Sequence, residues 1–579
     1  MLYNVSHFCY TLGTSLVMKI GKMMKIYYKI RQYGLHMVWY VLCVTTSHLY
    51  ASHHIAFKDV ASTVMFNSLQ PLPKDHFLRR LYSHLLFTPV WMQEDSPSVL
   101  ATSLLSDIEE DKTLPRASKL VQDAFMLQKK VEKLYAKHST LKEKVALEFQ
   151  LSQLYKGYAD YTLYGSIDWE AFQLRLHHLQ TEGIKADWVT YKPAFTPVSL
   201  LEQAVSSHNL TQMFQKAKPT SYHYAELEQA LCRYEQIAKS GGWGHVVLHG
   251  VLKPSKRYKS ILILRERLRA SGDYMGCDTP EGTRYDTCLK KAVMHFQQRH
   301  GLVADGVVGR QTQKALNVPV EVRIKEIRLN LDRIKWLHQP HAKRHIIINI
   351  PAFTLYFEED GALRQRMKVI TGRLKNPTPV FSNTVQTIVL NPNWNVPKSI
   401  IQKEMIPKLL NDPNAMAKKG IEIYEGWSKD APKVDATSID WSRYRYSKTM
   451  PFHFTQMPGY KNALGKVKFL FPNPYSVYMH DTPTKYLFHK NTRAFSHGCI
   501  RLQKPIALLQ TFSTFNDSVD FQKVQEKLKG DKKAYLKLDN KVPVDVVYLT
   551  AYVDYNGVLQ FRDDIYGYDK MQRLSYRKW

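Results

Sequence analysis

Cys499 is the residue of this 579-residue chain best suited to covalent chemistry. A cysteine attacks a carbonyl carbon as the thiolate, and a free thiol with a pKa near about 8.5 is mostly protonated at neutral pH, so it needs a neighbouring base. His497 lies two residues before Cys499 and His480 lies nineteen before it. Two adjacent strands and one loop would bring His480 to the sulfur. Gly498 leaves room for a substrate carbonyl to approach backbone N–H groups that act as an oxyanion hole.

Two other interpretations of these residues remain open. A single cysteine among apolar residues is often a small buried hydrophobe, and a His-x-Cys pair can be half of a zinc site. Zinc would need four ligands, and no HExxH or CxxC spacing elsewhere in the sequence supplies them. We therefore favour an acyl-transfer site and place metal binding second.

The segment from Ser496 to Arg501, with His480 before it, resembles the active-site motif of the L,D-transpeptidase (YkuD-type) family. The resemblance covers most of the chain after about the first fifty residues, and it is similar in detail to the large periplasmic, YcbB-like subgroup. The further segments that carry it are Val369–Arg373, Asn376–Pro379, Leu390–Pro397, Asn462–Phe469 and Phe561–Gly567.

This resemblance implies a reaction. In the family, the cysteine attacks the carbonyl of the third residue of a peptidoglycan stem tetrapeptide, usually meso-diaminopimelate, and expels the terminal D-alanine. An amine of a neighbouring stem then resolves the thioester and forms a 3→3 cross-link, without ATP or another cofactor. With water as the acceptor the protein would be an L,D-carboxypeptidase, and with a protein amine it would join the wall to a protein. A non-catalytic scaffold that binds peptidoglycan is a further alternative.

The resemblance also implies roles for individual residues. Cys499 is the expected nucleophile and His480 the general base, with Asp481 orienting the imidazole through its backbone carbonyl. Gly498 and Cys499 would supply the oxyanion-hole N–H groups, and His497 would support the site by hydrogen bonding. Carbapenems, which mimic the D-alanyl end, are expected to acylate Cys499. The expected substrate-binding residues are Ser496, Arg501, Trp394, Trp427 and Tyr444.

Residues 1–51 are typical of a secretory signal peptide or signal anchor. Basic residues between Lys19 and Arg31 precede an apolar run from Gly34 to Val44, and Ala51 offers a small residue for cleavage. The run is shorter than the roughly 18 apolar residues of a membrane span, although an uncleaved anchor remains open. We therefore expect export to the periplasm.

The composition is that of a strongly basic protein with few cysteines. Lys and Arg number 81 against 51 Asp and Glu, a net charge of +30, which favours polyanionic partners. No zinc-finger or helix-turn-helix signature is present, so we expect peptidoglycan stem peptides, glycan and anionic envelope surfaces as partners, with no nucleic acid and no obligate protein partner. Six cysteines are too few for a disulfide scaffold, although Cys277 and Cys288 are close enough to bridge one loop.

The chain is predicted to be a multidomain α+β protein. Apolar residues from Leu120 to Leu134 recur at helical spacing, which predicts an amphipathic helix. The resemblance implies that residues 75–245 form the helical scaffold domain of the subgroup. Residues 255–318 resemble a small three-helix peptidoglycan-binding domain, through Phe296-Gln297 and the turn that begins at Asp305-Gly306.

A mostly-β catalytic domain is expected over residues 344–549, where β-branched runs and the Asp360-Gly361 turn predict strands. An aromatic insertion lies at about 402–460. The resemblance implies that it forms a cap that excludes water from the acyl transfer, and a mobile surface loop is the alternative. Residues from Val542 to Tyr555 and the stretch that begins at Phe561 are expected to be closing strands of the catalytic domain, and residues 550–579 are the C-terminal tail.

Overall fold

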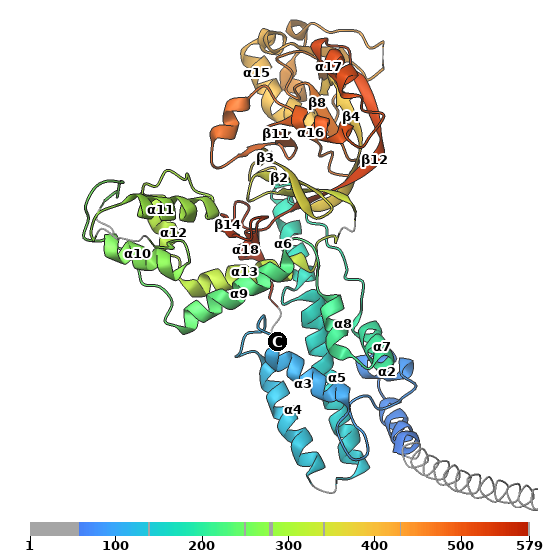
Figure 1. The fold of residues 1–579 in the computed structure, drawn as a ribbon. Helices are drawn as coiled ribbons and strands as arrows, with labels where there is room; N and C mark the ends of the chain where they lie inside the picture. Colours follow the sequence, from blue (N-terminus) through green and yellow to red (C-terminus); the bar gives the residue numbers. More distant parts are fainter. Residues whose placement is uncertain are drawn as a thin grey trace, which may run out of the picture. The chain divides into compact units, whose positions relative to one another are not determined.

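The computed structural model describes residues 57–136, 139–247, 250–276, 282–339, 342–428 and 430–576 (Figure 1). The predicted leader, residues 1–51, lies outside them. The described chain divides into two compact units. One contains the described residues up to Glu110, together with Arg116–Ala159 and Thr196–Lys216. The other contains Asp111–Pro115, Asp160–Phe195 and the described residues from Ala217 onward.

The first unit is helical, as the sequence predicts. The predicted apolar stripe is buried on α4, where Leu120, Ala124, Leu127 and Val131 face inward. A buried carboxylate, that of Glu148, accepts the N–H groups of the loop residues 90–92 at 2.6–2.9 Å and so fixes this loop to the helices. The helices are α2 (Phe77–His84), α3 (Val99–Glu110), α4 (Lys119–Tyr135), α7 (Pro197–Ser207), α8 (Leu210–Ala217) and most of α5 (Leu141–Tyr164).

Two helices of the predicted scaffold region belong to the second unit. They are α6 (Trp169–Thr181) and α9 (Tyr224–Lys239), and α9 packs along α13 (Val320–Ile334). Trp169 of α6 packs in one core cluster with the residues of the large sheet. The helical region predicted at residues 75–245 is therefore shared between the two units. None of the described helices has the length and apolar character needed to cross a membrane.

A small group of three helices has a core of its own, as predicted: α10 (Ile261–Ala270), α11 (Thr287–Arg299) and α12 (Arg310–Leu316). The buried amide of Gln297 donates to Asp305 Oδ1 at 3.0 Å and to Thr312 Oγ1 at 3.1 Å, and it accepts the N–H of Gly306 at 2.8 Å. Gln297 of the predicted motif thus connects the Asp305-Gly306 turn to helices α11 and α12. Cys288 of α11 is disulfide-bonded, and its expected partner Cys277 lies outside the described residues.

The catalytic region predicted at residues 344–549 is built on a nine-stranded sheet with the order β10-β3-β11-β9-β8-β4-β12-β1-β2. The last strand in this order, β2, also pairs with β3 near the other end, so the sheet closes on itself and few strand edges remain unpaired. The strands are β1 (Arg344–Asn349), β2 (Thr354–Glu359), β3 (Ala362–Gly372), β4 (Phe381–Leu390), β8 (Val467–Leu470), β9 (Met479–His480), β10 (Ala494–Ser496), β11 (Ile500–Leu502) and β12 (Ala534–Val547).

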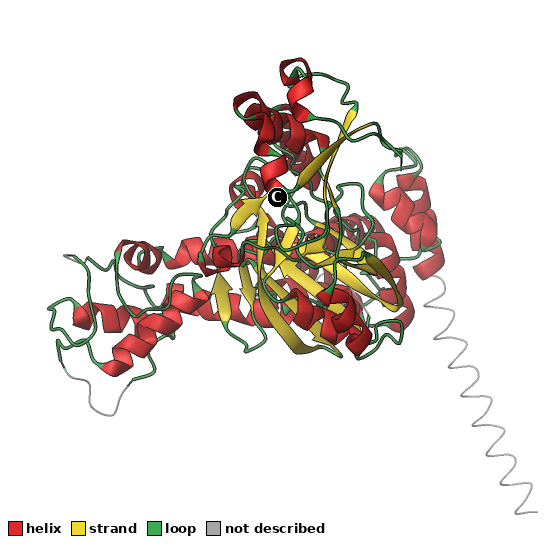
Figure 2. Cartoon of the chain, turned by 90° about the horizontal axis from the view of Figure 1, so that it is seen from above, coloured by secondary structure: helices red, strands yellow, loops and turns green. Residues whose placement is uncertain are grey.

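Two helices pack on this sheet, α16 (Pro505–Ser513) and α17 (Phe521–Lys529). Phe512 of α16 lies with its ring centroid 5.8 Å from that of Phe469 and 6.1 Å from that of Phe357. In Figure 2 the strands gather in one region with helices around them. The predicted mostly-β catalytic domain and the multidomain α+β fold class are confirmed.

The predicted insertion is a separate subdomain, which we call the cap, with its own sheet and core. Its strands are β5 (Trp394–Asn395), β6 (Ile421–Glu425) and β7 (Phe452–Gln456), in the order β5-β7-β6. Its helical turns include α14 (Lys398–Ile400), the π-helical turn η1 (Ile401–Met405), α15 (Ile406–Asn411), η3 (Ala417–Lys419) and η5 (Trp441–Tyr444). Because β5 pairs with β7, the cap begins before the predicted residue 402.

The closing strands predicted from Val542 onward are found in part: residues 542–547 belong to β12 of the nine-stranded sheet, but the C-terminal tail after them does not join that sheet. The tail's strands β13 (Ala551–Val553) and β14 (Leu559–Phe561) pair only with each other, and not with the nine-stranded sheet. The carboxylate of Asp554 accepts the N–H groups of Asn556 and Val558 and so closes a local hairpin. Helix α18 (Tyr568–Arg573) follows, and Tyr568 packs against Trp188 and Tyr548.

Candidate active site

Cys499 is the last residue of a three-residue loop between β10 and β11. The hydroxyl of Ser496 donates to the backbone oxygen of Cys499 at 2.5 Å and accepts the N–H of Gly498 at 3.1 Å. Gly498 has φ +117°, a backbone conformation that residues with a Cβ rarely adopt. Ser496, predicted to bind substrate, therefore uses its hydroxyl to hold residues 497–499, which we call the nucleophile loop after the predicted role of Cys499. The N–H of Gly498, predicted to face an oxyanion, is directed to Ser496 instead.

His480 is buried on β9, which pairs with the strand that follows Cys499: Met479 is in register with Ile500. Its Nδ1 lies 2.5 Å from the backbone oxygen of Asp481. Because a carbonyl oxygen only accepts, Nδ1 carries the proton and Nε2 is left as an acceptor. Burial, with the nearby charge of Arg501, lowers the pKa of His480 to about 3, so the imidazole is neutral at physiological pH.

The carboxylate of Asp481 fixes the backbone around this histidine. It accepts the N–H of Thr482 at 2.7 Å and that of Lys466 at 2.9 Å, and it forms an ion pair with Lys485. Gly465 makes this possible, because a Cβ at its position would lie 2.3 Å from Asp481 Oδ2. Asp481 thus holds its own carbonyl in place under the imidazole.

Two cations flank the imidazole. Lys468 of β8 and Arg501 of β11 are both in register with His480, one on each side, so the three side chains stand in a row on one face of the sheet. The ammonium of Lys468 also lies 3.7 Å from the centroid of the Tyr478 ring. Positive charge on both sides of His480 disfavours its protonation and favours an anion nearby.

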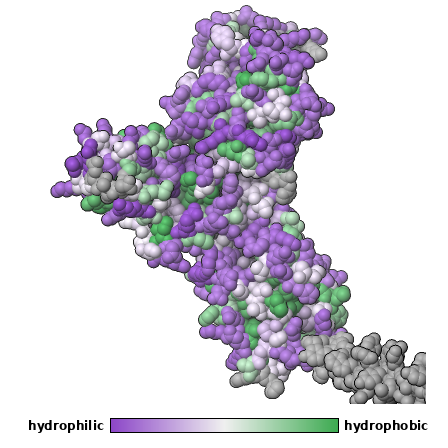
Figure 3. All heavy atoms as spheres, in the orientation of Figure 1, coloured by the Kyte–Doolittle hydropathy of each residue, from purple (hydrophilic) through white to green (hydrophobic). Residues whose placement is uncertain are grey.

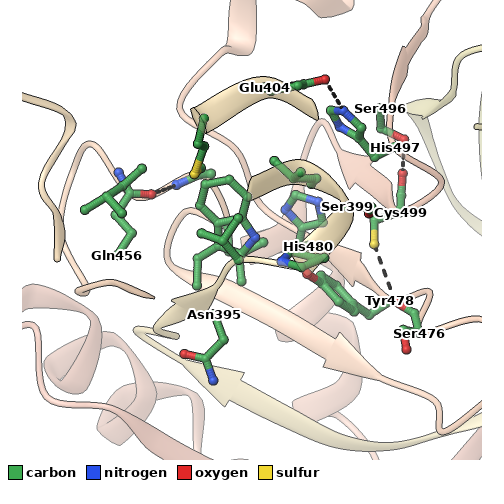
Figure 4. Close-up of a pocket in the computed structure, with 18 of the residues that line it drawn as sticks. Asn395, Ser399, Glu404, Gln456, Ser476, Tyr478, His480, Ser496, His497 and Cys499 are labelled. Carbon is green, nitrogen blue, oxygen red and sulfur yellow. Dashed lines mark hydrogen bonds and ion pairs between the residues drawn. The ribbon is translucent and has the colours of Figure 1, made fainter. Parts of the chain in front are cut away.

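The thiol of Cys499 is protonated in the resting site. Burial raises its pKa, against the opposing effects of hydrogen bonds from Tyr478 and of the charges of Lys468 and Arg501. The thiol is directed to the backbone oxygen of Ser476 at 3.7 Å, a distance at the long end for a sulfur donor (Figure 4). A neutral thiol and a neutral imidazole therefore line the same cavity.

His497 connects the nucleophile loop to the cap. Its Nε2 lies 2.6 Å from Oε1 of Glu404, which the π-helical turn η1 presents, and the same oxygen accepts from Arg373 at 2.8 Å (Figure 4). Burial raises the pKa of Glu404, but hydrogen bonds from His497 and Arg373 outweigh it and hold the pKa below its usual value. We call this group of three residues the cap latch.

A cavity of about 1060 Å³ lies between the cap and the sheet, and Cys499 and His480 both line it. Of the predicted substrate-binding residues, Ser496, Arg501, Trp394 and Trp427 line it as well. Trp427 is 65% exposed and stacks on His453, with ring centroids 4.6 Å apart.

Tyr444 does not line this cavity, which corrects its predicted role. It packs instead on Trp441 and Phe452 in the core of the cap, at centroid distances of 6.3 and 5.1 Å. Across the described residues, no group of three or more His, Cys, Asp or Glu side chains is close enough to hold a metal ion.

Comparison with known proteins identifies the regions of the chain. Residues 343–525, which contain the whole site, match the family described as "L,D-transpeptidase catalytic domain" (YkuD). The chain carries an L,D-transpeptidase catalytic domain. Residues 76–231 match the family described as "Scaffold domain", and residues 257–316 match the "Putative peptidoglycan binding domain" family.

Known proteins with this transpeptidase domain resemble parts of the chain. A Haemophilus influenzae protein named "Putative L,D-transpeptidase" is 31% identical over 255 residues, which are 44% of this chain and 50% of that protein. The chain thus spans half the length of this curated relative. Solved L,D-transpeptidases from Stackebrandtia nassauensis and Mycobacterium smegmatis are 16% and 14% identical. The matches cover 51% and 36% of this chain and 94% and 59% of theirs, with TM-scores of 0.21 and 0.17. At such TM-scores nothing further about this chain follows from them.

Tyr566 of the C-terminal tail contacts the transpeptidase domain beside the nucleophile loop. Thr378 donates its hydroxyl proton to the backbone oxygen of Gly498 at 2.8 Å and accepts the N–H of Gly372 at 2.8 Å. The hydroxyl of Tyr566 donates to the oxygen of Gly372 at 2.6 Å and accepts the N–H of Thr378 at 3.2 Å. Tyr566 is therefore connected to the loop of Cys499 through a single residue, Thr378. The sequence indicates no chemistry in the segment that contains Tyr566.

Sequence reasoning assigned no role to Lys468, Tyr478, Glu404 or Tyr566. The segment around Lys468 does carry a signal, since Val467 and Phe469 are buried and Lys468 alternates with them. That alternation places Lys468 on the opposite face from its neighbours. Which strand lies beside it could not be read from the sequence.

Proposed function

We propose that this protein is an exported, periplasmic L,D-transpeptidase that forms 3→3 peptidoglycan cross-links through a thioester on Cys499. The observation that carries the proposal is that Cys499 lines the same cavity as a neutral His480 whose Nδ1 proton is held by the carbonyl of Asp481. This arrangement leaves Nε2 free to take the thiol proton. The leader in the sequence supports export, and the matched peptidoglycan-binding family supports a wall substrate.

The first half-reaction is the acylation of the enzyme. His480 Nε2 takes the thiol proton as Sγ attacks the carbonyl carbon of the third stem residue, and a tetrahedral oxyanion forms. The backbone N–H of Cys499 has no hydrogen-bond partner in the described part of the chain, so it is free to donate to this oxyanion. When the amide bond breaks, the imidazolium returns its proton to the departing D-alanine nitrogen, and the thioester remains.

The second half-reaction consumes an amine. The neutral amine of a neighbouring stem attacks the thioester carbonyl, and its proton passes to His480 Nε2. The C–S bond breaks, and the sulfur takes the proton back from His480 as the new amide bond is completed. Lys468 and Arg501 stabilise the negative charge that passes through the sulfur in both half-reactions.

The test uses the protein without residues 1–51, incubated with purified disaccharide-tetrapeptide beside a Cys499→Ala control. We expect an intact-mass increase on the wild-type protein and a 3→3 dimer among the products, both absent from the control. Tripeptide without dimer would replace the proposal with an L,D-carboxypeptidase. If the fragment binds but neither sample yields a product, the transpeptidase proposal is replaced by a non-catalytic scaffold.

A further inference from the structure

The cavity over Cys499 is strongly basic. Seven lysines and one arginine line it, against a single carboxylate, that of Glu404. This carboxylate is already engaged in the cap latch with His497 and Arg373. The face of the molecule drawn in Figure 3 is mostly hydrophilic, with scattered hydrophobic residues. A cavity with one sign of charge concentrates ligands of the other sign.

The cavity lysines divide by their partners. Lys418 forms an ion pair with Asp412 at 2.7 Å, Lys398 donates to the backbone oxygen of Lys448, and Lys468 lies over the Tyr478 ring. The four others, Lys185, Lys408, Lys419 and Lys461, form no ion pair with any carboxylate of the described residues, and all of them except Lys185 belong to the cap region. We call the three in the cap region the cap lysines: Lys408 is on α15, Lys419 ends η3, and Lys461 follows β7.

One buried amide connects the segments that carry two of the cap lysines, Lys419 and Lys461. The Nε2 of Gln456, in β7, donates to the backbone oxygen of Lys419 at 2.8 Å and to that of Lys461 at 3.0 Å. Its Oε1 accepts the N–H of Ala463 at 2.9 Å, so the amide is fully used. Gln456 is 6% exposed and itself lines the cavity (Figure 4). Two lysine-bearing segments are thus anchored to a single side chain.

Lys408 and Lys419 repel each other. Burial and the neighbouring Lys408 ammonium both lower the pKa of Lys419. The negative charge of Glu404 opposes this effect, but Glu404 is already bonded to His497 and Arg373. Two like charges that share so little opposing charge are unfavourable in the unliganded protein, and an anion between them removes the repulsion. An exposed carboxylate is the matching anion in a cavity that opens on an acyl-transfer cysteine, since the occupant there is the reacting peptide.

We propose that Lys408, Lys419 and Lys461 form a carboxylate-binding subsite in the cap that holds a peptide substrate while Cys499 reacts with it. The identity of that peptide as a peptidoglycan stem rests on the proposed function. The subsite makes the cap a determinant of substrate affinity, in addition to a cover over the thiol. A peptide with its carboxylates blocked therefore loses the interaction.

The experiment measures thioester formation on the protein lacking residues 1–51, as a function of fragment concentration, for disaccharide-tetrapeptide and for the same fragment with its carboxylates amidated. In Lys408→Met/Lys419→Met we expect the half-saturating concentration of the native fragment to rise about tenfold, with the rate at saturation nearly unchanged. With the amidated fragment we expect the variant and the wild type to be equal. Lys408→Arg/Lys419→Arg is expected to restore most of the affinity.

The matched control is Lys403→Met/Lys433→Met, which removes two cap charges that do not line the cavity and is expected to behave as wild type. Equal half-saturation in wild type and Lys408→Met/Lys419→Met would overturn the subsite, as would an equal loss with native and amidated fragments. The proposed function fails separately. If the wild type forms no thioester, the subsite is tested by binding alone. Calorimetry then compares Cys499→Ala with Cys499→Ala/Lys408→Met/Lys419→Met, each with the native and the amidated fragment. Weaker binding of the native fragment alone to the lysine variant supports the subsite, and equal binding overturns it.

Discussion

The imidazole of His497 and the carboxylate of Glu404 lie 2.6 Å apart, which joins the nucleophile loop directly to the cap. His497 is two residues from Cys499, whereas Glu404 belongs to a π-helical turn in the cap. Single π-helical turns are often found at functional sites because they re-aim one side chain. The position of the cap and the conformation of the loop are therefore coupled through one hydrogen bond.

Loss of the cap latch is expected to slow acylation. Glu404→Gln keeps the size of the side chain but removes its charge, and a charge-assisted hydrogen bond is worth more than a neutral one. We expect the second-order rate constant for thioester formation to fall about fivefold to tenfold, with a charge-assisted bond taken as about 1.5–3 kcal/mol and reduced for partial exposure.

A double-mutant cycle with His497→Gln tests the origin of this effect. If the bond between the two residues is the cause, the double variant loses no more than the larger of the two single losses. Additive losses would mean that Glu404 and His497 act separately. Lys403→Gln, one residue from Glu404 and outside the cavity lining, is the control and is expected to leave the rate unchanged.

The pH dependence of acylation is expected to lack a fall near the ordinary pKa of histidine. The pKa of His480 is lowered to about 3, so this base stays neutral as the pH falls from 8 to 5. The pKa of the Cys499 thiol is raised, so the rate increases with pH on the alkaline side. The check is a rate profile for carbapenem acylation from about pH 5 to pH 9.5, followed by intact mass. A drop centred near pH 6.5 would contradict the assignment of a neutral, buried His480.

The two cations beside His480 are expected to set the acidity of the thiol. In Lys468→Met or Arg501→Met, the pKa of Cys499 rises further, because a charge that favours the thiolate is gone. The measurement is the pH dependence of iodoacetamide alkylation of Cys499 in a Cys232→Ser background, since Cys232 is the other free thiol of the described residues. Lys468→Arg keeps the charge and is expected to keep the profile. An unchanged profile in both Met variants would remove the cations from the mechanism.

The parts of the site that could be predicted from the sequence are those that are close together in it. Ser496 to Cys499 form one loop, and Asp481 follows His480 directly, so their types and spacing are sufficient. The row of Lys468, His480 and Arg501 depends on the register of three strands, which the sequence does not specify.

Other residues of the site could not be predicted because their role depends on whether the side chain packs in a core or lines the cavity after folding. Tyr444 and Trp427 stand in the same aromatic insertion, yet one packs into the core of the cap and the other lines the cavity. Composition cannot separate them, because aromatic residues are equally suited to either place. Tyr566 reaches the nucleophile loop from the tail only because Tyr548 and Tyr568 hold its segment.

Gly465 is expected to be needed for both the stability of the transpeptidase domain and the orientation of His480. Its φ is +60°, and a Cβ there would lie 2.3 Å from Asp481 Oδ2, so Gly465→Ala must displace the carboxylate that fixes the backbone of this loop. We expect a loss of about 1–3 kcal/mol of stability and slower thioester formation.

Gly557→Ala is the control that separates two effects of Gly465→Ala: the strain of a positive φ on alanine, and the contact of its Cβ with Asp481. Gly557 also has a positive φ, +72°, but nothing lies within 4 Å of the position that an alanine Cβ would take there, so this substitution carries only the conformational cost. The measurement is the urea midpoint of unfolding for both variants, together with their acylation rates. Gly465→Ala should lie below Gly557→Ala in midpoint and should alone lose acylation rate, because only its displaced neighbour, Asp481, carries the carbonyl that holds the proton on Nδ1 of His480. Equal effects of the two substitutions would show that the contact between Gly465 and Asp481 does not position the base.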